Sequence, residues 1–239
     1  MINFRSDFFV MTKPFNARLG DRGFTLVELM IACAIGSIVM GGALIFFNSQ
    51  NRYYVSQNEV VVMQQNAKIA MDMITRDIRS AGYDPNNLGA GITVAGLNTL
   101  SFTREDDLPA NGLETLTYSL FDAFATTAPP GNDGLVDDLA LQITLAGGGS
   151  AGRQVVAENI SRLEFRYLDK DGIVTADLAD IRSIQVSILA VVNYHNSFDD
   201  IFFNNMTYTS ASGTVWGPFN DSLRRRLLIT TIQCRNLGL

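Results

Sequence analysis

The chain has 239 residues, of which 47% are hydrophobic and 18% charged, and its formal net charge is −6. This length suits one sizeable globular domain, alone or with an appendage. The composition is too apolar for a disordered protein and not apolar enough for a protein with several membrane spans. The negative net charge argues against a nucleic-acid binder.

The first segment of the chain is basic. Residues 1–23 contain four basic and two acidic side chains, so the residues after Gly23 sum to −8. A basic segment directly before an apolar span stays on the cytoplasmic side of a membrane. We therefore expect residues 1–23 to lie in the cytoplasm if a span follows them.

A long apolar run does follow. It extends from Phe24 to Phe47 and contains one charge, Glu28. A helix of this length rises about 36 Å, enough to cross a hydrocarbon core of ~30 Å. A secretory signal has a shorter apolar region of ~7–15 residues, which ends in a small-residue cleavage site. Here the small residues 41–43 lie inside the run, so residues 24–47 are predicted to span the membrane, with all later residues on the opposite side.

The helical pattern continues beyond the apolar run. Residues 48–80 contain neither Gly nor Pro. Their apolar positions predict one stripe that packs on a domain, made of Val55, Val62, Ile69, Met73, Ile74 and Ile78. Gly82 and Pro85 predict that the helix ends near Ser80.

Short strand-like runs and turn-forming residues make up the remainder, 81–239. The expected strands are 97–103, 115–120, 139–145, 160–168, 181–192 and 226–233. Two of these, 160–168 and 181–192, alternate apolar and polar residues with a period of two, as half-buried strands do. We expect an α+β domain in which a mainly antiparallel sheet packs on the second half of the helix.

Residues 22–29 read RGFTLVEL, and this string resembles the processing site of type IV prepilins and pseudopilins. The resemblance implies a type IV pilin-like fold and cleavage between Gly23 and Phe24. A membrane-bound prepilin peptidase makes this cut on the cytoplasmic side and then methylates the new amine of Phe24. Gly23 has no side chain and so lets an active site approach the backbone closely. The cleaved leader is residues 1–23, or a 13-residue leader if Met11 is the true start.

Glu28 has two interpretations. Near the membrane interface, its carboxylate can complement the positive end of the helix dipole. The family resemblance implies a second role, in which this carboxylate pairs with the free Phe24 amine of a neighbouring subunit and sets the register during assembly. Such pairing offsets the desolvation of both charges. Both interpretations can hold together.

Three internal segments narrow the resemblance. Residues 76–83, and residues 156–160 running into 163–167, resemble segments of PilW-like minor pilins and of the GspJ-type minor pseudopilin. Residues 224–226 together with 234–236 resemble the C-terminus of PilW-like proteins. The implied function is a minor pilin in the priming or tip complex of a type IV pilus. The near alternative is a minor pseudopilin of a type II secretion system.

The resemblance also implies partners and a location. The partners are the prepilin peptidase, other minor pilins, the major pilin and inner-membrane lipid, with no nucleic acid. The chain is expected in the bacterial inner membrane as a single-pass protein with its C-terminal domain in the periplasm, or at the surface in a pilus.

The sequence departs from the family pattern in one respect. Many major pilins have a proline in the apolar helix, and none occurs between Phe24 and Phe47.

Other candidate sites are weak. His195 is the one histidine in the sequence, and it forms neither a zinc-type cluster nor a nucleophile–base pair. Asp169, Asp171 and Asp180 fall at the first, third and twelfth positions of a possible calcium loop, but the Asp-Gly turn within it is also an ordinary hairpin signal. We therefore expect no metal, no cofactor and no enzyme activity. The alternative of another class, a membrane-anchored periplasmic enzyme or ligand-binding domain, lacks a catalytic constellation.

The remaining features are two cysteines and a run of arginines. Cys33 and Cys234 are expected to be small buried hydrophobic residues that form no intrachain disulfide. Residues 224–226 are three consecutive arginines, which either bind an acidic partner or form a solvated face beside local acidic groups.

Overall fold

The computed structural model describes residues 23–105, 112–122, 137–145, 149–192 and 202–238. Most of the predicted leader and His195 lie outside these residues. The chain divides into two compact units, Met1–Ser49 and Gln50–Leu239. Each unit is described by itself.

Helix α1 spans Leu26–Ser80 and contributes residues to both units. In the first unit its large apolar side chains are exposed. Among the described residues, helix α1 is long and apolar enough to cross a membrane. The helix ends where the sequence indicated, because Gly82 adopts a left-handed backbone with φ of 75°. A side chain at Gly82 would also collide with Leu237, so this position requires glycine.

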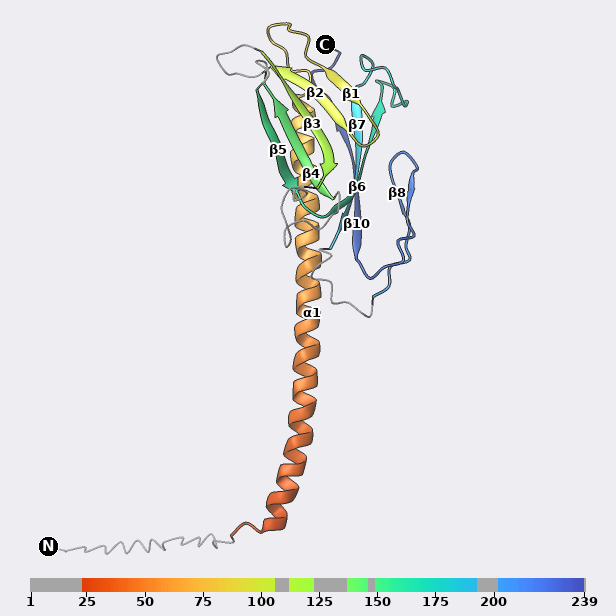
Figure 1. Cartoon of the computed structure of the whole chain (residues 1–239). Coiled ribbons are helices and arrows are strands. Elements are labelled where there is room, and N and C mark those ends of the chain that lie inside the picture. Colours follow the sequence, from red (N-terminus) through yellow and green to blue (C-terminus); the bar gives the residue numbers. More distant parts are fainter. Residues whose placement is uncertain (1–22, 106–111, 123–136, 146–148, 193–201, 239) are drawn as a thin grey trace, which may run out of the picture. The chain divides into compact units, whose positions relative to one another are not determined.

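The second unit contains a five-stranded antiparallel sheet on α1 (Figure 1). Its strands lie in sequence order, and each pairs with the next in antiparallel orientation. They are β1 (Ile92–Ala95), β2 (Leu100–Glu105), β3 (Leu113–Phe121), β4 (Asp138–Thr144) and β5 (Ser150–Ala157).

A second antiparallel sheet has three strands in the order β10-β7-β6. These are β6 (Ile160–Leu168), β7 (Ser183–Val191) and β10 (Arg225–Gln233). Strands β8 (Tyr208–Thr209) and β9 (Val215–Trp216) form a separate small hairpin. The antiparallel pairing agrees with the prediction, but the described strands divide into two larger sheets and this hairpin, a division that the sequence did not predict. The break lies between β5 and β6, where Asn159 has a positive φ of 60° and turns the chain.

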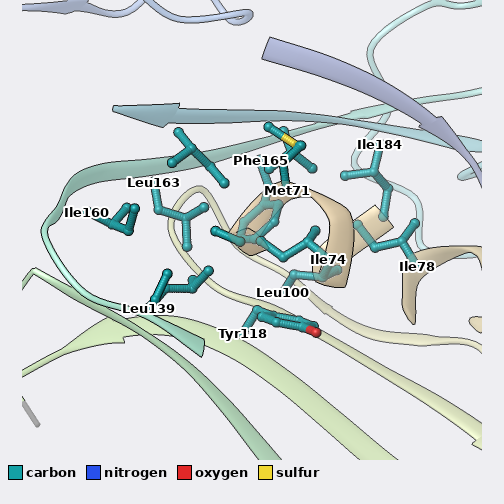
Figure 2. Close-up of a cluster of buried hydrophobic side chains, with 14 of the residues drawn as sticks. Met71, Ile74, Ile78, Leu100, Tyr118, Leu139, Ile160, Leu163, Phe165 and Ile184 are labelled. Atoms are coloured by element: carbon teal, nitrogen blue, oxygen red, sulfur yellow. The ribbon is translucent and has the colours of Figure 1, made fainter. Parts of the chain in front are cut away.

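The core lies where α1 meets both sheets. Figure 2 shows Met71, Ile74 and Ile78 of α1 among side chains from β2, β3 and β4 of one sheet and β6 and β7 of the other. The helix residues buried in the core are Met63, Ala67, Ala70, Met71, Ile74 and Ile78. Two of these six are alanines with no exposed surface, which lets the strands approach the helix closely.

The predicted helix stripe was therefore partly wrong. Ile74 and Ile78 are buried as expected, but Val62 is 45% exposed and Ile69 is 54% exposed. The core instead uses Met63 and Ala70, each one residue later along the helix. One residue turns an α-helix by about 100°, so the heptad positions that were predicted to face the core lie on a neighbouring face.

Candidate functional site

The site to which the sequence points is the start of α1. Gly23, Phe24 and Thr25 precede the helix, and all three are exposed. Thr25 caps it: the backbone N–H of Glu28 donates to Thr25 Oγ1 at 3.2 Å. In return, Glu28 Oε2 accepts from the Thr25 N–H at 3.0 Å and from the Thr25 hydroxyl at 2.9 Å. This reciprocal arrangement is a capping box.

The capping box gives Glu28 a role within its own chain. Its carboxylate satisfies an N–H group that the helix cannot pair, and it lies at the positive end of the helix dipole. Among the described residues, the hydrogen bonds that Glu28 accepts from Thr25 both end on Oε2, which leaves Oε1 able to accept a further donor. The interpretation from charge alone overlooked Thr25, although the spacing Thr-x-x-Glu at 25–28 is the sequence signature of this cap.

Gly23 is not required by the chain's own fold. A Cβ added at Gly23 would meet no atom within 4 Å, and its φ lies outside the left-handed region. The chain's own fold therefore does not explain the glycine at this position. Gly41, in the same apolar run, has equally open surroundings.

At the other end of α1, a buried polar cluster ties the helix to the five-stranded sheet. Asp77 is 3% exposed, and its Oδ2 accepts a 2.6 Å hydrogen bond from the Tyr118 hydroxyl of β3. Burial, together with the Asp77 carboxylate, raises the pKa of Tyr118 far above its ordinary value, so the hydroxyl stays protonated. Arg104 of β2 donates to Ser80 Oγ at 3.0 Å and pairs with Glu114 of β3. These contacts join the C-terminal part of α1 to strands β2 and β3.

The weak calcium candidates are arranged as a turn. Asp169 Oδ1 accepts the backbone N–H groups of Asp171 at 2.9 Å and Ile173 at 2.8 Å. Among the described residues, which include all of 169–180, no group of three or more His, Cys, Asp or Glu side chains is placed to hold a metal ion. A cavity of about 520 Å³ beside this turn is lined by Asp169 together with three cationic side chains, Lys170, Arg182 and Arg235, a balance of charge that disfavours a cation.

Both cysteines are free thiols. Cys234 is buried as expected, and burial raises the pKa of its thiol to about 12, against an opposing effect of the Arg182 charge. A thiol with that pKa is not a nucleophile at neutral pH. Cys33 is exposed in the first unit and not buried by the chain itself, which differs from the expectation.

The arginine run combines internal contacts with exposed charge. Arg225 forms a two-point ion pair with Asp221, with nitrogen–oxygen distances of 2.8 and 2.5 Å, and its guanidinium lies 3.8 Å from the centre of the Phe219 ring. Arg224 lies over the Phe202 ring at 4.9 Å. Arg226 is exposed. Local contacts therefore engage two of the three arginines.

Comparisons with known proteins give two findings. Residues 18–44 match the family model described as the prokaryotic N-terminal methylation motif. Among solved structures, a type IV-like pilin from Thermus thermophilus is similar with a TM-score of 0.48 and 10% sequence identity, over 74% of this chain and 98% of that one. A search of curated proteins finds no match to the chain.

The matched segment coincides with the candidate site. It contains Gly23, Phe24, the capping box and most of the apolar run. The motif supports the type IV pilin superfamily and implies processing by a prepilin peptidase and assembly with other pilins. Together with the apolar helix, it indicates anchoring in a membrane.

Proposed function

We propose that the chain is a PilW-like minor pilin that takes part in type IV pilus assembly as a member of the priming or tip complex. The observation that carries the proposal is the methylation motif at the exposed start of an apolar helix, with a carboxylate one helical turn inside it. The resemblance of three internal segments, which begin at residues 76, 156 and 224, to minor pilins supports the finer assignment.

The proposal divides the chain into four parts. Residues 1–23 are a cytoplasmic leader that is removed, and 24–47 anchor the chain in the inner membrane. Residues 48–80 form the amphipathic half of the helix, and 81–239 form a periplasmic β-rich domain. The cut between Gly23 and Phe24 precedes both the cap and the first helical residue, Leu26, so maturation leaves α1 intact.

Processing tests the proposal directly. Co-expression with a prepilin peptidase should yield a chain that begins at Phe24 with a methylated amine, seen by mass spectrometry of the intact protein. Gly23→Ala should block the cut without disturbing the fold, because space around Gly23 is open. Gly41→Ala, an equally unhindered change inside the same run, is the matched control and should be cut normally. A chain that stays full length beside an active peptidase would refute the proposal.

The assembly role assigned to Glu28 needs a test that separates its charge from its capping. Glu28→Leu removes both and should leave the protein in the membrane while lowering the number of pili. Glu28→Gln keeps a capping acceptor but loses the charge, since Gln also serves in a capping box. Thr25→Ala does the reverse, because it removes the capping hydroxyl and keeps the charge.

If Glu28 pairs with the Phe24 amine of a neighbour, the Gln variant should assemble as poorly as the Leu variant, and Thr25→Ala should assemble better than either. Normal piliation by Glu28→Gln, in cells without the native copy, would contradict the role of the charge. The same strains assayed for protein secretion identify the alternative. A secretion defect with normal piliation would make the chain a minor pseudopilin.

A further inference from the structure

The four outer edges of the two larger sheets differ in how they are protected. Edge strand β1 has four residues and a register shift, and edge strand β5 has two register shifts. Edge strand β6 is covered by other backbone: the Phe165 N–H donates to Leu97 O at 2.8 Å and the Ile160 N–H to Asp137 O at 2.6 Å. Short strands, bulges and covering loops are the usual ways of preventing an edge from pairing with another strand.

Among the residues that the structure describes, strand β10 has none of these protections. It pairs with β7 over nine residues, Arg225–Gln233, in one uninterrupted register. Its middle, 227–232, reads LLITTI and contains no charge, no proline and no glycine. Such a long, regular and apolar edge is one that natural proteins seldom leave open.

The direction of the backbone groups on β10 follows from two hydrogen bonds at its ends. The Val192 N–H donates to Arg224 O at 3.0 Å, and the Cys234 N–H donates to Arg182 O at 2.9 Å. Hydrogen-bonded pairs alternate along an antiparallel ladder, so the even-numbered residues of β10 face β7. The N–H and C=O groups of Leu227, Ile229, Thr231 and Gln233 therefore point to the free edge. Within the part of the chain that the structure describes, none of these groups has a backbone partner.

We propose that β10 is a docking edge that accepts an extended strand of another protein, in the manner of β-strand addition. Four residues spaced by two present their backbone donors and acceptors in one row, and that row is the template for an added strand. The inference rests on the sheet edge alone and is independent of the processing and assembly roles of the N-terminal segment.

The charges at the two ends of β10 indicate the chemistry of the partner strand. Arg226 and Arg235 are exposed, and neither forms an ion pair with a described residue. A partner strand that carries acidic residues at both ends and uncharged, β-branched residues between them complements this edge. A second copy of the chain is a poor partner because two basic ends would face each other in either strand direction, and like charges on paired strands are unfavourable.

The test uses the full chain in detergent micelles and two synthetic decapeptides. Both have an alternating Thr/Val middle; one has Glu at both ends and the other Lys. Amide hydrogen exchange followed residue by residue should show fast exchange at Ile229 and Thr231 in the free protein. The Glu peptide should slow exchange there, and the Lys peptide should not.

Proline substitutions distinguish edge docking from other binding. The N–H of Ile229 faces outward, so Ile229→Pro removes a docking donor and keeps the ladder with β7. It should weaken Glu-peptide binding about fivefold or more, as expected for one lost hydrogen bond. The matched control is Thr230→Pro, which removes a donor to β7 and should lower the unfolding midpoint clearly more than Ile229→Pro does.

A charge swap keeps the proposal testable if the proline variant folds poorly. Changing both Arg226 and Arg235 to Glu should reverse the preference, so that the Lys peptide binds and the Glu peptide does not. Equal binding of the two peptides, or protection by neither at millimolar concentration, would overturn the proposal. A dimer of the native chain that Ile229→Pro dissociates would also overturn it, because the occupant would then be a second copy.

Discussion

At the scale of single residues, the contact that most clearly joins helix to sheet is the hydrogen bond from Tyr118 to Asp77. A carboxylate with 3% exposure is stable only if donors replace the water it has lost. The Tyr118 hydroxyl supplies one donor at 2.6 Å, and the guanidinium groups of Arg76 and Arg104 lie 3.3 and 4.0 Å away. These three groups therefore replace the water that the Asp77 carboxylate loses when the helix packs on the sheet.

Removing the donor from this pair should be costly. Tyr118→Phe keeps the ring in the core but leaves the Asp77 oxygen without its donor, and we expect a loss of about 1.5–3 kcal/mol in the free energy of unfolding. Tyr167→Phe is the matched control, because that hydroxyl donates to a neutral acceptor, Gly96 O, at 2.8 Å. The control should lose about 0.5–1.5 kcal/mol. Urea unfolding of the two variants measures the difference, and equal losses would contradict a larger contribution from the Tyr118–Asp77 hydrogen bond.

At the scale of elements, one side chain organises the segment after α1. The Asp84 carboxylate accepts the backbone N–H groups of Leu88 and Gly89, each at 2.6 Å, and of Ala90 at 3.0 Å. The bond from Ala90 holds the pKa of Asp84 below its ordinary value of 3.8 against the opposing effect of burial, and the bonds from Leu88 and Gly89 act in the same direction. The loop conformation thus depends on an ionised carboxylate.

The dependence of folding stability on pH through Asp84 has a defined direction. The pKa is lower in the folded state, so the carboxylate contributes stability above pH 3.8, and that contribution is lost as the pH falls through the folded-state pKa. We expect amide exchange at Leu88, Gly89 and Ala90 to accelerate below pH 3.8 relative to β-sheet amides. In Asp84→Asn these amides should exchange faster at neutral pH and show no acid transition. A transition centred above pH 3.8 in the native chain would be inconsistent with this dependence.

The elements also show which sequence signals are sufficient. All six predicted strands are present, and 160–168 matches β6 at both ends, because alternation and flanking turns define a half-buried strand locally. Strands β1 and β5 were missed, as were the two-residue strands β8 and β9. Strand β1 has four residues, and β5 contains Gly152 with a φ of 77°, which interrupts the alternation that would have identified it.

The helix shows where a local pattern is insufficient. Val62 and Ile69 repeat at a regular spacing, yet Met63 and Ala70 are the residues that contact the sheets. Both sets satisfy helical periodicity, and the choice between them depends on which side chains let the strands approach. The choice depends on tertiary contacts that the helix sequence alone does not contain. The small size of Ala67 and Ala70 favours their face only because the sheets pack closely against it. At the candidate site the motif pointed to Gly23 and Glu28, whose roles stay predictions, and the cap at Thr25 was overlooked although the spacing Thr-x-x-Glu indicates it.

At the scale of the whole molecule, the two units differ in how they meet their hydrophobic requirement. In the first unit the large apolar side chains of α1 are exposed, as expected for residues that lipid covers. In the second unit the helix contributes buried side chains to a core that both sheets share. The sequence indicated this contrast, but the division of the strands into two sheets depends on long-range packing.

The second unit should therefore fold without the first. A chain that begins at Gln50 keeps every buried helix residue, since the first of them is Met63. We expect it to be soluble without detergent and to unfold cooperatively, with a thermal midpoint within a few degrees of that of the full chain in micelles. Circular dichroism during heating measures both.

The matched control is a chain that begins at Ala81. It lacks six buried hydrophobic side chains of α1: Met63, Ala67, Ala70, Met71, Ile74 and Ile78. Removing Met63, Met71, Ile74 and Ile78 alone costs about 2–5 kcal/mol each, which together approaches or exceeds the ~5–15 kcal/mol that stabilises a typical domain. This chain should show no cooperative transition, because the facing sides of both sheets would be exposed to water. A cooperative transition at the same midpoint in both truncated chains would show that α1 is attached to the domain without forming part of its core.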